Sequence, residues 1–431
     1  MDGANLYTVG DGLFGTHVTL ADIEEDLQRE FGTSASFGPN NSVTDIGDGN
    51  GFMSKILLIN PDWQNKDKEL PQKFIVKILT QLVIQKFSKQ VSEQRKVTDH
   101  FSDQEFMSKF ETLQRLCHNA EVTVYKQLAK IPAEKLSVPK VYYSKSFSES
   151  NPLKGYIIME YLENSRGVHI FENISPEQIK EVLRYKAILE ASTLDMTLED
   201  RQCLIQNPFT NVFGSLFRKE TLDTIIGSLS RFNDGELIDQ AERLSRIVPE
   251  MDLSSADHMA EEHGMESVLC HGDLWSMNIL WQNDGKGPKL AALVDYQVSH
   301  FGCSATDLVR VFSACLSGKD RQEKWEDLLE QFYDYLMEEV GDRKMPYTLE
   351  QLKETYRRFF PIGAFLVAPM IGPLYDAIFM SPDEDKKKKC LEIITEKTRC
   401  LVDDILHFHD RNKVIKDAIR DGVNDVANEN Q

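Results

Sequence analysis

Residues 271–280 read His-Gly-Asp-Leu-Trp-Ser-Met-Asn-Ile-Leu, and residues 293–297 read Leu-Val-Asp-Tyr-Gln. These stretches place a carboxylate at Asp273, a side-chain amide at Asn278, and a second carboxylate, Asp295, at the end of an apolar run. Transfer of a phosphoryl group needs little covalent help from a protein and depends on positioning and charge neutralisation. Such side chains can orient a hydroxyl and hold magnesium against phosphate oxygens. The pattern therefore predicts a phosphoryl-transfer site.

The composition limits the class of protein. The chain has 431 residues and 41% of them are hydrophobic, which allows two or three structural units or one large domain of two lobes. The formal net charge of −20 argues against nucleic acid as the main partner, because binding to a phosphate backbone requires clustered Lys and Arg. A nucleotide is not excluded, since a few local groups are enough to bind it.

We expect a cytoplasmic protein with no membrane segment. Met1–Gly15 lacks the basic start and apolar core of a signal peptide. The longest apolar stretch, Ala364–Gly372, contains Pro369 and is shorter than the roughly twenty residues that cross a bilayer. The seven Cys are odd in number and have no metal-like spacing, which is typical of reduced thiols. The oligomeric state is left open.

Strand patterns dominate the first third of the chain. Periodicity predicts strands at 43–46, 55–59, 74–79, 138–141 and 156–159, and helices at 19–30 and 106–128. Residues 81–105 include a polar stretch of mixed charge that we interpret as an insertion. The segment 1–160 is therefore predicted to be a sheet-rich N-terminal lobe. The glycine-rich loop at Gly47–Gly51 and Lys77 would make it the lobe that binds a nucleotide.

Helical periods dominate the rest of the chain. They predict helices at 175–193, 221–229, 235–247, 322–340, 349–360 and 385–407. A β-like interruption at 268–298 carries the motif quoted above. The predicted fold class is therefore α+β, with a larger, mostly helical C-terminal lobe at 161–421 and a flexible tail at 422–431.

A glycine-rich loop and a strand lysine form a second pattern. Gly47, Gly49 and Gly51 alternate between the first two strands, and glycine lets backbone N–H groups approach phosphate oxygens closely. An ordinary hairpin turn has the same composition. Ser54 follows the loop and offers a hydroxyl, unless it is simply a strand residue. Lys77 lies inside an apolar strand, where a charge must find solvent or a partner.

The order of these features resembles the protein-kinase-like fold. His-Gly-Asp in place of His-Arg-Asp is similar to its small-molecule branch, which includes choline kinases, aminoglycoside phosphotransferases and ecdysteroid kinases. The chain more closely resembles the CHK kinase-like group of nematodes and insects, over roughly residues 40–410. The motifs that carry this resemblance are Asn50–Ser54, His118–Glu121 before Tyr125, His271–Trp275, and Asp295–Gln297.

The resemblance implies a bilobal fold with an antiparallel sheet and one long helix in the small lobe. It also implies an ATP- and Mg-dependent kinase that phosphorylates a hydroxyl of a small molecule, such as a steroid, xenobiotic, glycoside or amino alcohol. Asp273 would accept or orient the proton of that hydroxyl. Asn278 and Asp295 would bind magnesium through oxygen atoms. His271 would brace the loop, and Asp307 would hold its backbone.

The resemblance also assigns residues to the nucleotide. Lys77 would contact the α- and β-phosphates and would be held by a helix carboxylate. Glu121 is the predicted partner, and Glu111 is its rival nearly three helical turns away. Glu160 and Leu162 follow a predicted strand and would contact adenine through main-chain atoms.

Three positions bear on the kind of kinase. Gln297 replaces the Gly of protein kinases, so one or two metal ions are possible. Trp275 stands where protein kinases carry a Lys that helps the transferred phosphate, so no such charge exists here, and Trp275 is expected to pack the loop or to border the acceptor pocket instead. Asp307 lies only twelve residues beyond Asp295, which leaves no room for an activation segment and argues against protein substrates.

The acceptor is not identified by the sequence. An aromatic cluster is predicted to be mostly core, with one or two members available for an acceptor pocket: Tyr356, Phe359, Phe360, Phe365 and Tyr375. The alternative function is a catalytically inactive nucleotide-binding pseudokinase or interaction module. The presence together of Lys77, Asp273, Asn278 and Asp295 favours the kinase. A hydrolase is disfavoured because the chain lacks a Gly-x-Ser-x-Gly elbow.

Overall fold

The computed structural model describes residues 5–47, 53–95, 103–283, 288–371, 378 and 382–429. The chain divides into two units, each made of separate segments. Unit 1 comprises Met1–Ser165, Thr197–Ile205 and Ala291–Ser299, and unit 2 comprises Arg166–Met196, Gln206–Leu290 and His300–Gln431. The segment around Asp295 groups with the N-terminal unit.

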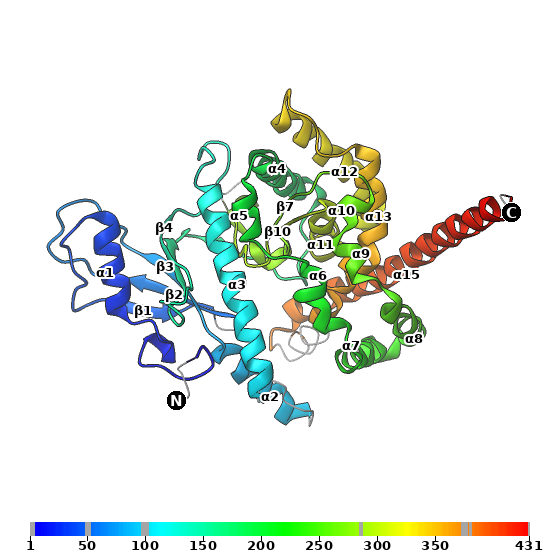
Figure 1. Cartoon of the computed structure of the whole chain (residues 1–431). Helices are drawn as coiled ribbons and strands as arrows, with labels where there is room; N and C mark the ends of the chain where they lie inside the picture. The colour runs from blue at the N-terminus through cyan, green and yellow to red at the C-terminus, as the bar shows by residue number, and fades with distance from the viewer. Residues whose placement is uncertain are drawn as a thin grey trace. The chain divides into compact units, whose positions relative to one another are not determined.

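Unit 1 is built on a five-stranded antiparallel sheet with the order β1-β2-β3-β5-β4 (Figure 1). Its strands are β1 (Ser42–Asp45), β2 (Ser54–Asn60), β3 (Phe74–Leu79), β4 (Val141–Lys145) and β5 (Tyr156–Glu160). Its helices are η1 (Leu13–Gly15), α1 (Leu20–Phe31), α2 (Leu82–Arg95), α3 (Gln104–Leu128) and α5 (Leu198–Gln202).

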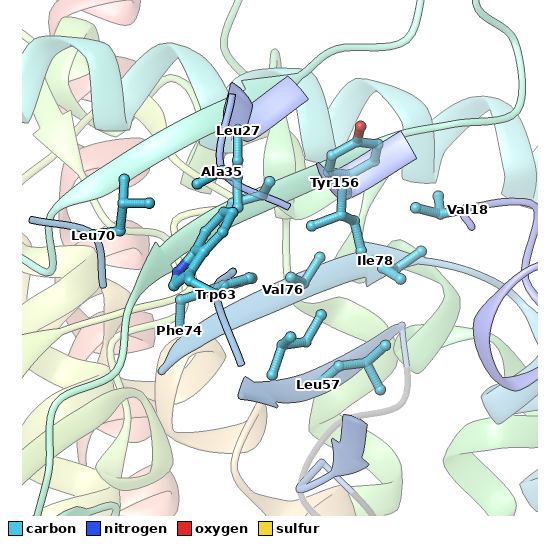
Figure 2. Packing of buried hydrophobic residues seen from close by; sticks show 13 residues of the cluster. Val18, Leu27, Ala35, Leu57, Trp63, Leu70, Phe74, Val76, Ile78 and Tyr156 are labelled. Carbon is cyan, nitrogen blue, oxygen red and sulfur yellow. The ribbon is translucent and has the colours of Figure 1, made fainter. Parts of the chain in front are cut away.

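The core of unit 1 fixes which way Lys77 points. Side chains alternate between the two faces of a strand, so Phe74, Val76 and Ile78 of β3 share one face. Figure 2 shows these three residues in the same buried cluster as Leu27 of α1. Lys77 therefore projects from the opposite face of the sheet, where it meets α3.

One predicted strand of unit 1 needs correction. The strand predicted at 138–141 begins only at Val141, because Pro139 has no N–H to donate to a ladder. The segment 81–105, interpreted as an insertion, forms α2 and the first residues of α3. Residues 96–102 lie outside the described part of the chain. The other strands and both helices agree with the predicted ranges to within a few residues.

Unit 2 is mostly helical (Figure 1). Its α-helices are α4 (Pro176–Thr193), α6 (Pro208–Asn211), α7 (Lys219–Arg231), α8 (Ile238–Ile247), α9 (Leu253–Asp257), α10 (Met259–Glu262), α11 (Ala305–Cys315), α12 (Gly318–Val340), α13 (Leu349–Phe365) and α15 (Glu384–Glu429). Short 3-10 helices are η3 (Phe213–Phe217), η4 (Phe232–Gly235), η5 (Val248–Glu250) and η6 (Ser276–Asn278).

Two small sheets complete the secondary structure of the described residues. Strands β7 (Val268–Cys270) and β10 (His300–Gly302) pair antiparallel, and they bracket the predicted catalytic loop in the sequence. A three-stranded sheet has the order β6-β8-β9, formed by β6 (Ser165–Arg166), β8 (Ile279–Asn283) and β9 (Pro288–Leu293). The β-like interruption predicted at 268–298 thus consists of short strands separated by loops.

Two helices of unit 2 extend beyond their predicted ends. Helix α13 continues past Pro361 to Phe365. A proline inside a helix cannot donate to the carbonyl four residues earlier. The side chain of Asn412 replaces that donor, since its Nδ2 lies 3.0 Å from the Arg357 oxygen. Helix α15 runs to Glu429, so residues 422–429, predicted as a flexible tail, continue a helix.

The architecture confirms the predicted fold class. An antiparallel five-stranded sheet with one long helix, followed by a mostly helical region, is a protein-kinase-like fold. Within the described ranges, every helix is too short or too polar to cross a lipid bilayer.

Candidate active site

The His-Gly-Asp loop of unit 2 is held by a buried carboxylate. Asp307, in the first turn of α11, accepts hydrogen bonds from the backbone N–H groups of His271 (2.8 Å) and Gly272 (2.9 Å). Gly272 adopts φ +82°, a left-handed conformation that favours glycine. The Asp273 N–H donates to Nδ1 of His271 at 3.3 Å, so His271 braces the loop from inside. The loop thus presents Asp273 in a defined orientation.

Asn278 is folded back onto Asp273 by the turn η6. Its Nδ2 donates to the backbone oxygen of Asp273 at 2.9 Å and lies 3.3 Å from carboxylate Oδ2. These contacts use the nitrogen of the amide and leave Oδ1 of Asn278 as the atom that suits a magnesium ion. The five-residue spacing read from the sequence therefore brings this pair together.

Arg310 of α11 is a site residue that the sequence reasoning missed. Its Nε and Nη2 donate to Oδ1 of Asp273 at 2.9 and 2.5 Å. Arg310 therefore brings a positive charge to Asp273 from 37 residues further along the chain. One signal could have found it: Asp307 and Arg310 are three apart in an otherwise apolar helix, which places both on one face.

A buried charge cluster supports the loop from behind, and the sequence reasoning missed it as well. Lys186 of α4 contacts Asp307 Oδ2 at 2.9 Å and Glu190 at 2.6 Å. Glu190 also accepts hydrogen bonds from the Ser304 and Tyr347 hydroxyls, each at 2.6 Å. Two charges four residues apart within the apolar pattern of α4 were the available signal.

Burial and charge act against each other in this cluster. Burial lowers the pKa of Lys186, but Asp307 and Glu190 outweigh it, so the pKa is raised. Burial raises the pKa of Asp307, but Lys186, His271 and the loop N–H groups outweigh it, so that pKa is lowered. Asp307 therefore stays ionised while it holds the loop.

In unit 1, Lys77 is held by two carboxylates. Its Nζ lies 2.9 and 2.7 Å from the two oxygens of Glu121 and 2.6 Å from Oδ1 of Asp295. Glu111, the rival partner, instead accepts from the Leu6 N–H at 3.1 Å and pairs with Arg115. Burial lowers the pKa of Lys77, but Asp295 and Glu121 outweigh it and raise the pKa above its ordinary value.

The backbone at Asp295 is unusual. Its φ of +70° lies in the left-handed region, which non-glycine residues adopt rarely and often at functional sites. Oδ1 faces Lys77, which leaves Oδ2 for other contacts, and the side chain is 30% exposed. Asp295 therefore combines a left-handed backbone with a partly exposed carboxylate.

The glycine loop is described only in part. The Gly47 N–H donates to Asp45 Oδ1 at 3.0 Å, whereas Gly49 and Gly51 lie outside the described residues. Ser54, at the start of β2, is buried, and its hydroxyl has no hydrogen-bond partner among the described residues. A buried hydroxyl without a partner costs free energy unless a ligand or water satisfies it.

The segment after β5 carries Glu160 and Leu162. The Glu160 N–H donates to the Lys140 oxygen at 2.8 Å, and the Lys140 N–H donates to the Glu160 carboxylate at 3.1 Å, not to its main-chain oxygen. The Leu162 oxygen accepts from the Ser165 hydroxyl at 2.7 Å. The Leu162 N–H has no partner in the part of the chain that the structure describes.

The aromatic cluster is mainly core, as predicted. Tyr356, Phe359, Phe360 and Phe365 are each 1% exposed or less, and Tyr375 lies outside the described residues. A cavity of about 280 Å³ does touch this cluster, with lining residues that include Trp325, Tyr356, Phe360 and Phe408. No group of three or more His, Cys, Asp or Glu side chains in the described ranges forms a metal site of its own.

The chain is similar in sequence to a protein family and to two curated relatives. The DUF1679 family model, described as "Uncharacterized oxidoreductase dhs-27", matches residues 6–413. The *Caenorhabditis elegans* protein of that description is 24% identical over 353 residues, covering 78% of this chain and 40% of the relative. The *C. elegans* "Uncharacterized kinase-like protein D1044.1" is 22% identical over 241 residues, covering 56% of this chain and 61% of the relative. The chain therefore spans less than two thirds of the length of either.

Two solved structures resemble the chain at low sequence identity. A choline kinase from *Cryptosporidium parvum* is 12% identical, with a TM-score of 0.41, covering 88% of this chain and 90% of that one. A GDP and kanamycin complex of APH(2")-IIia is 13% identical, with a TM-score of 0.39, covering 87% and 97%.

Proposed function

Because the chain belongs to the DUF1679 family of kinase-like proteins, we propose that it is an ATP- and magnesium-dependent kinase that phosphorylates a hydroxyl of a small molecule. Steroids, xenobiotics, glycosides and amino alcohols are the acceptor classes in view, and the cytoplasm is the proposed location. One observation carries the proposal most directly. Lys77 is buried between Glu121 and Asp295, and the Asp295 carboxylate is partly exposed.

The residues of unit 1 suit a nucleotide. Lys77 would contact phosphate oxygens while Glu121 holds its position. The Ser54 hydroxyl, which is buried without a partner among the described residues, would donate to a phosphate. Backbone N–H groups of Gly47, Gly49 and Gly51 would add further donors.

The segment after β5, which carries Glu160 and Leu162, has suitable main-chain groups for adenine. The edge of adenine offers one N–H donor beside one nitrogen acceptor. The Leu162 N–H can donate to that nitrogen. The Glu160 oxygen can accept from the amino group, since the neighbouring Lys140 N–H is directed to the carboxylate instead. We therefore propose contacts with adenine at these two residues.

The oxygen atoms at Asn278 and Asp295 suit a magnesium ion. Magnesium prefers a few protein oxygens completed by phosphates and water, and does not need a cluster of three side chains. Asn278 Oδ1 and Asp295 Oδ2 are the oxygens that the protein contacts leave over. When bound, the ion would neutralise charge on the phosphates.

Asp273 would handle the proton of the acceptor hydroxyl. Its Oδ1 is held by Arg310, so Oδ2 is the atom that can accept a hydrogen bond from the hydroxyl. In a loose phosphoryl transfer the proton leaves late, so alignment by a fixed carboxylate matters more than strong basicity.

The test uses Asp273→Asn with labelled ATP and a metabolite extract as the source of acceptors. We expect transfer to fall by about 10²–10⁴-fold, the usual range for loss of a proton-transfer group, while binding of Mg-ATP is retained. Asp342→Asn, a change at an exposed carboxylate, is the matched control and is expected to keep full transfer. Unchanged turnover in Asp273→Asn contradicts the assignment. Nucleotide binding without any transfer by the wild type favours the pseudokinase.

The family description mentions an oxidoreductase, and the fold argues against that activity for this chain. Dinucleotide-binding folds place the cofactor at the end of a parallel sheet built from βαβ units. The five-stranded sheet of unit 1 is antiparallel throughout. The relative of that description is far longer, since this chain covers only 40% of it.

A further inference from the structure

We propose that Arg310 is a further catalytic residue, whose guanidinium binds an oxygen of the phosphoryl group during its transfer. This inference rests on the proposed kinase function. It assigns to a residue of α11 the charge that protein kinases place in the catalytic loop, where this chain has Trp275. Three separate observations in unit 2 support it.

The first observation is the burial pattern of α11. Every residue of this helix is buried except Arg310. Asp307 and Arg310 are three residues apart and therefore lie on one face, and both contact the loop at residues 271–273. A helix that is otherwise part of the core thus directs one cation to the catalytic carboxylate.

The second observation is an unused donor group. Nε and Nη2 of Arg310 both donate to Oδ1 of Asp273. Nη1 is buried and has no hydrogen-bond partner in the described ranges of the chain. A buried charged donor without a partner is unfavourable, and guanidinium N–H groups pair best with anionic oxygens. Nη1 belongs to the same planar group that touches Asp273, so its expected partner is an oxygen of a ligand beside that carboxylate.

The third observation concerns charge. A carboxylate placed to receive a hydroxyl proton repels an approaching phosphoryl group. Arg310 offsets the charge of Asp273 through Oδ1 and leaves Oδ2 for the hydroxyl. The nearby Lys186 cannot take this role, because its charge is paired with Glu190 and Asp307. The ring of Phe213 lies 5.8 Å from the Arg310 Cζ and helps to fix the guanidinium.

A positioning role is the rival interpretation. In that case Arg310 would act only by holding Asp273, and it would not touch the phosphoryl group. The two roles differ in a background where Asp273 is neutral. A contact with the phosphoryl group survives the loss of the Asp273 charge, whereas a role exerted through Asp273 does not.

The experiment measures binding of MgADP with and without aluminium fluoride, which mimics a phosphoryl group in transfer. The full chain is compared with Arg310→Met, Arg310→Lys, Asp273→Asn and the Asp273→Asn/Arg310→Met double variant. We expect fluoride to tighten MgADP binding at least tenfold in the wild type and in Asp273→Asn. Both Arg310→Met variants are expected to lose that gain while they bind MgADP alone normally, and Arg310→Lys is expected to keep part of it.

Several outcomes overturn the inference. A full fluoride gain in Arg310→Met removes any contact with the phosphoryl group. A gain that is lost with Arg310 only when Asp273 is intact shows a positioning role. A wild type that binds MgADP but gains nothing from fluoride also counts against it. A wild type that does not bind MgADP at all contradicts the proposed kinase function itself. Failure of the proposed function can therefore be told apart from failure of the inference about Arg310. Arg184→Gln, which changes an exposed ion pair with Glu338, is the control.

Discussion

The chain contains the same charge arrangement twice, once in each unit. In unit 1, Lys77 lies between Glu121 and Asp295, and in unit 2, Lys186 lies between Glu190 and Asp307. The exposed fractions of the side chains differ between the two clusters. The side chains of Lys186 and Asp307 are each 1% exposed, whereas Asp295 is 30% exposed. We call these the open cluster (Lys77, Glu121, Asp295) and the closed cluster (Lys186, Glu190, Asp307).

The partners of each carboxylate explain what the difference means. In the closed cluster, the carboxylates also accept bonds from two hydroxyls and two backbone N–H groups of the protein. In the open cluster, Asp295 meets Lys77 through one oxygen, and its side chain is partly exposed. A lysine between two carboxylates is therefore not a sign of chemistry in itself. The closed cluster fixes a loop, and the open cluster retains an oxygen for a ligand.

The largest expected effect is the loss of the closed lysine. Lys186→Met would leave two buried carboxylates without their cation, and removal of one partner of a buried ion pair typically costs about 3–5 kcal/mol. Lys77→Met should lower the free energy of unfolding by less, because it leaves one buried carboxylate, Glu121, and the partly exposed Asp295 without their cation. Urea denaturation of both variants measures this difference. Equal losses would show that the two clusters are structurally equivalent.

A smaller effect is expected from His118, which lies on α3 one turn before Glu121 of the open cluster. Burial lowers the pKa of His118 to about 4, opposed by a 2.9 Å bond from Nε2 to the Lys145 oxygen and assisted by the charge of Lys77. Between pH 6.5 and 4 the unfolded chain therefore takes up a proton that the folded chain refuses. The free energy of unfolding should fall as pH falls through this window, by about 3 kcal/mol at pH 4.

The measurement compares wild type with His118→Gln, whose side chain does not titrate. The wild-type free energy of unfolding should fall more steeply from pH 6.5 to 4, and parallel curves would refute the assignment. Lys77→Met sharpens the test. Lys77→Met removes a positive charge near the imidazole. The fall in the free energy of unfolding between pH 6.5 and 4 should therefore be smaller in Lys77→Met than in the wild type.

The smallest expected effect is on ligand affinity. Asp295→Asn should weaken binding of Mg-ATP by about tenfold, or about 1.4 kcal/mol, because an amide oxygen attracts magnesium less than a carboxylate does. Binding of ATP without magnesium should change little. Glu190→Gln, in the closed cluster, should leave Mg-ATP affinity unchanged and lower stability instead. A titration with equal Mg-ATP affinities for wild type and Asp295→Asn contradicts the role of the open cluster.

The sequence allowed some of these features to be predicted and concealed others. The strand around Lys77 and the helix that carries Glu121 follow from local periodicity, and the structure shows this pair in contact. Arg310 and Lys186 were missed, because a charged residue in a helical pattern is normally solvated. The spacing of the charges in each helix was the local signal, but that spacing does not show that α11 and α4 are buried around these residues.

Two of the differences from the predicted elements have physical causes that periodicity alone does not reveal, one local and one tertiary. The strand before β5 starts late because of Pro139. Helix α13 continues through Pro361 because Asn412, which is distant in the sequence, supplies the missing donor. In the first case a local rule was underused, and in the second it was overridden by a tertiary contact.

The sequence by itself determined the type and order of the secondary structure, the fold class and the loop with Asp273 and Asn278. These features depend on neighbouring residues, whose periodicity and turn chemistry are visible in the chain. Only the tertiary structure decided which charges pair. Lys77 and Asp295 are 218 residues apart, and Lys186 and Asp307 are 121 apart. Over such separations, burial and distance select one partner among many charged residues, and neither quantity is a property of a local segment.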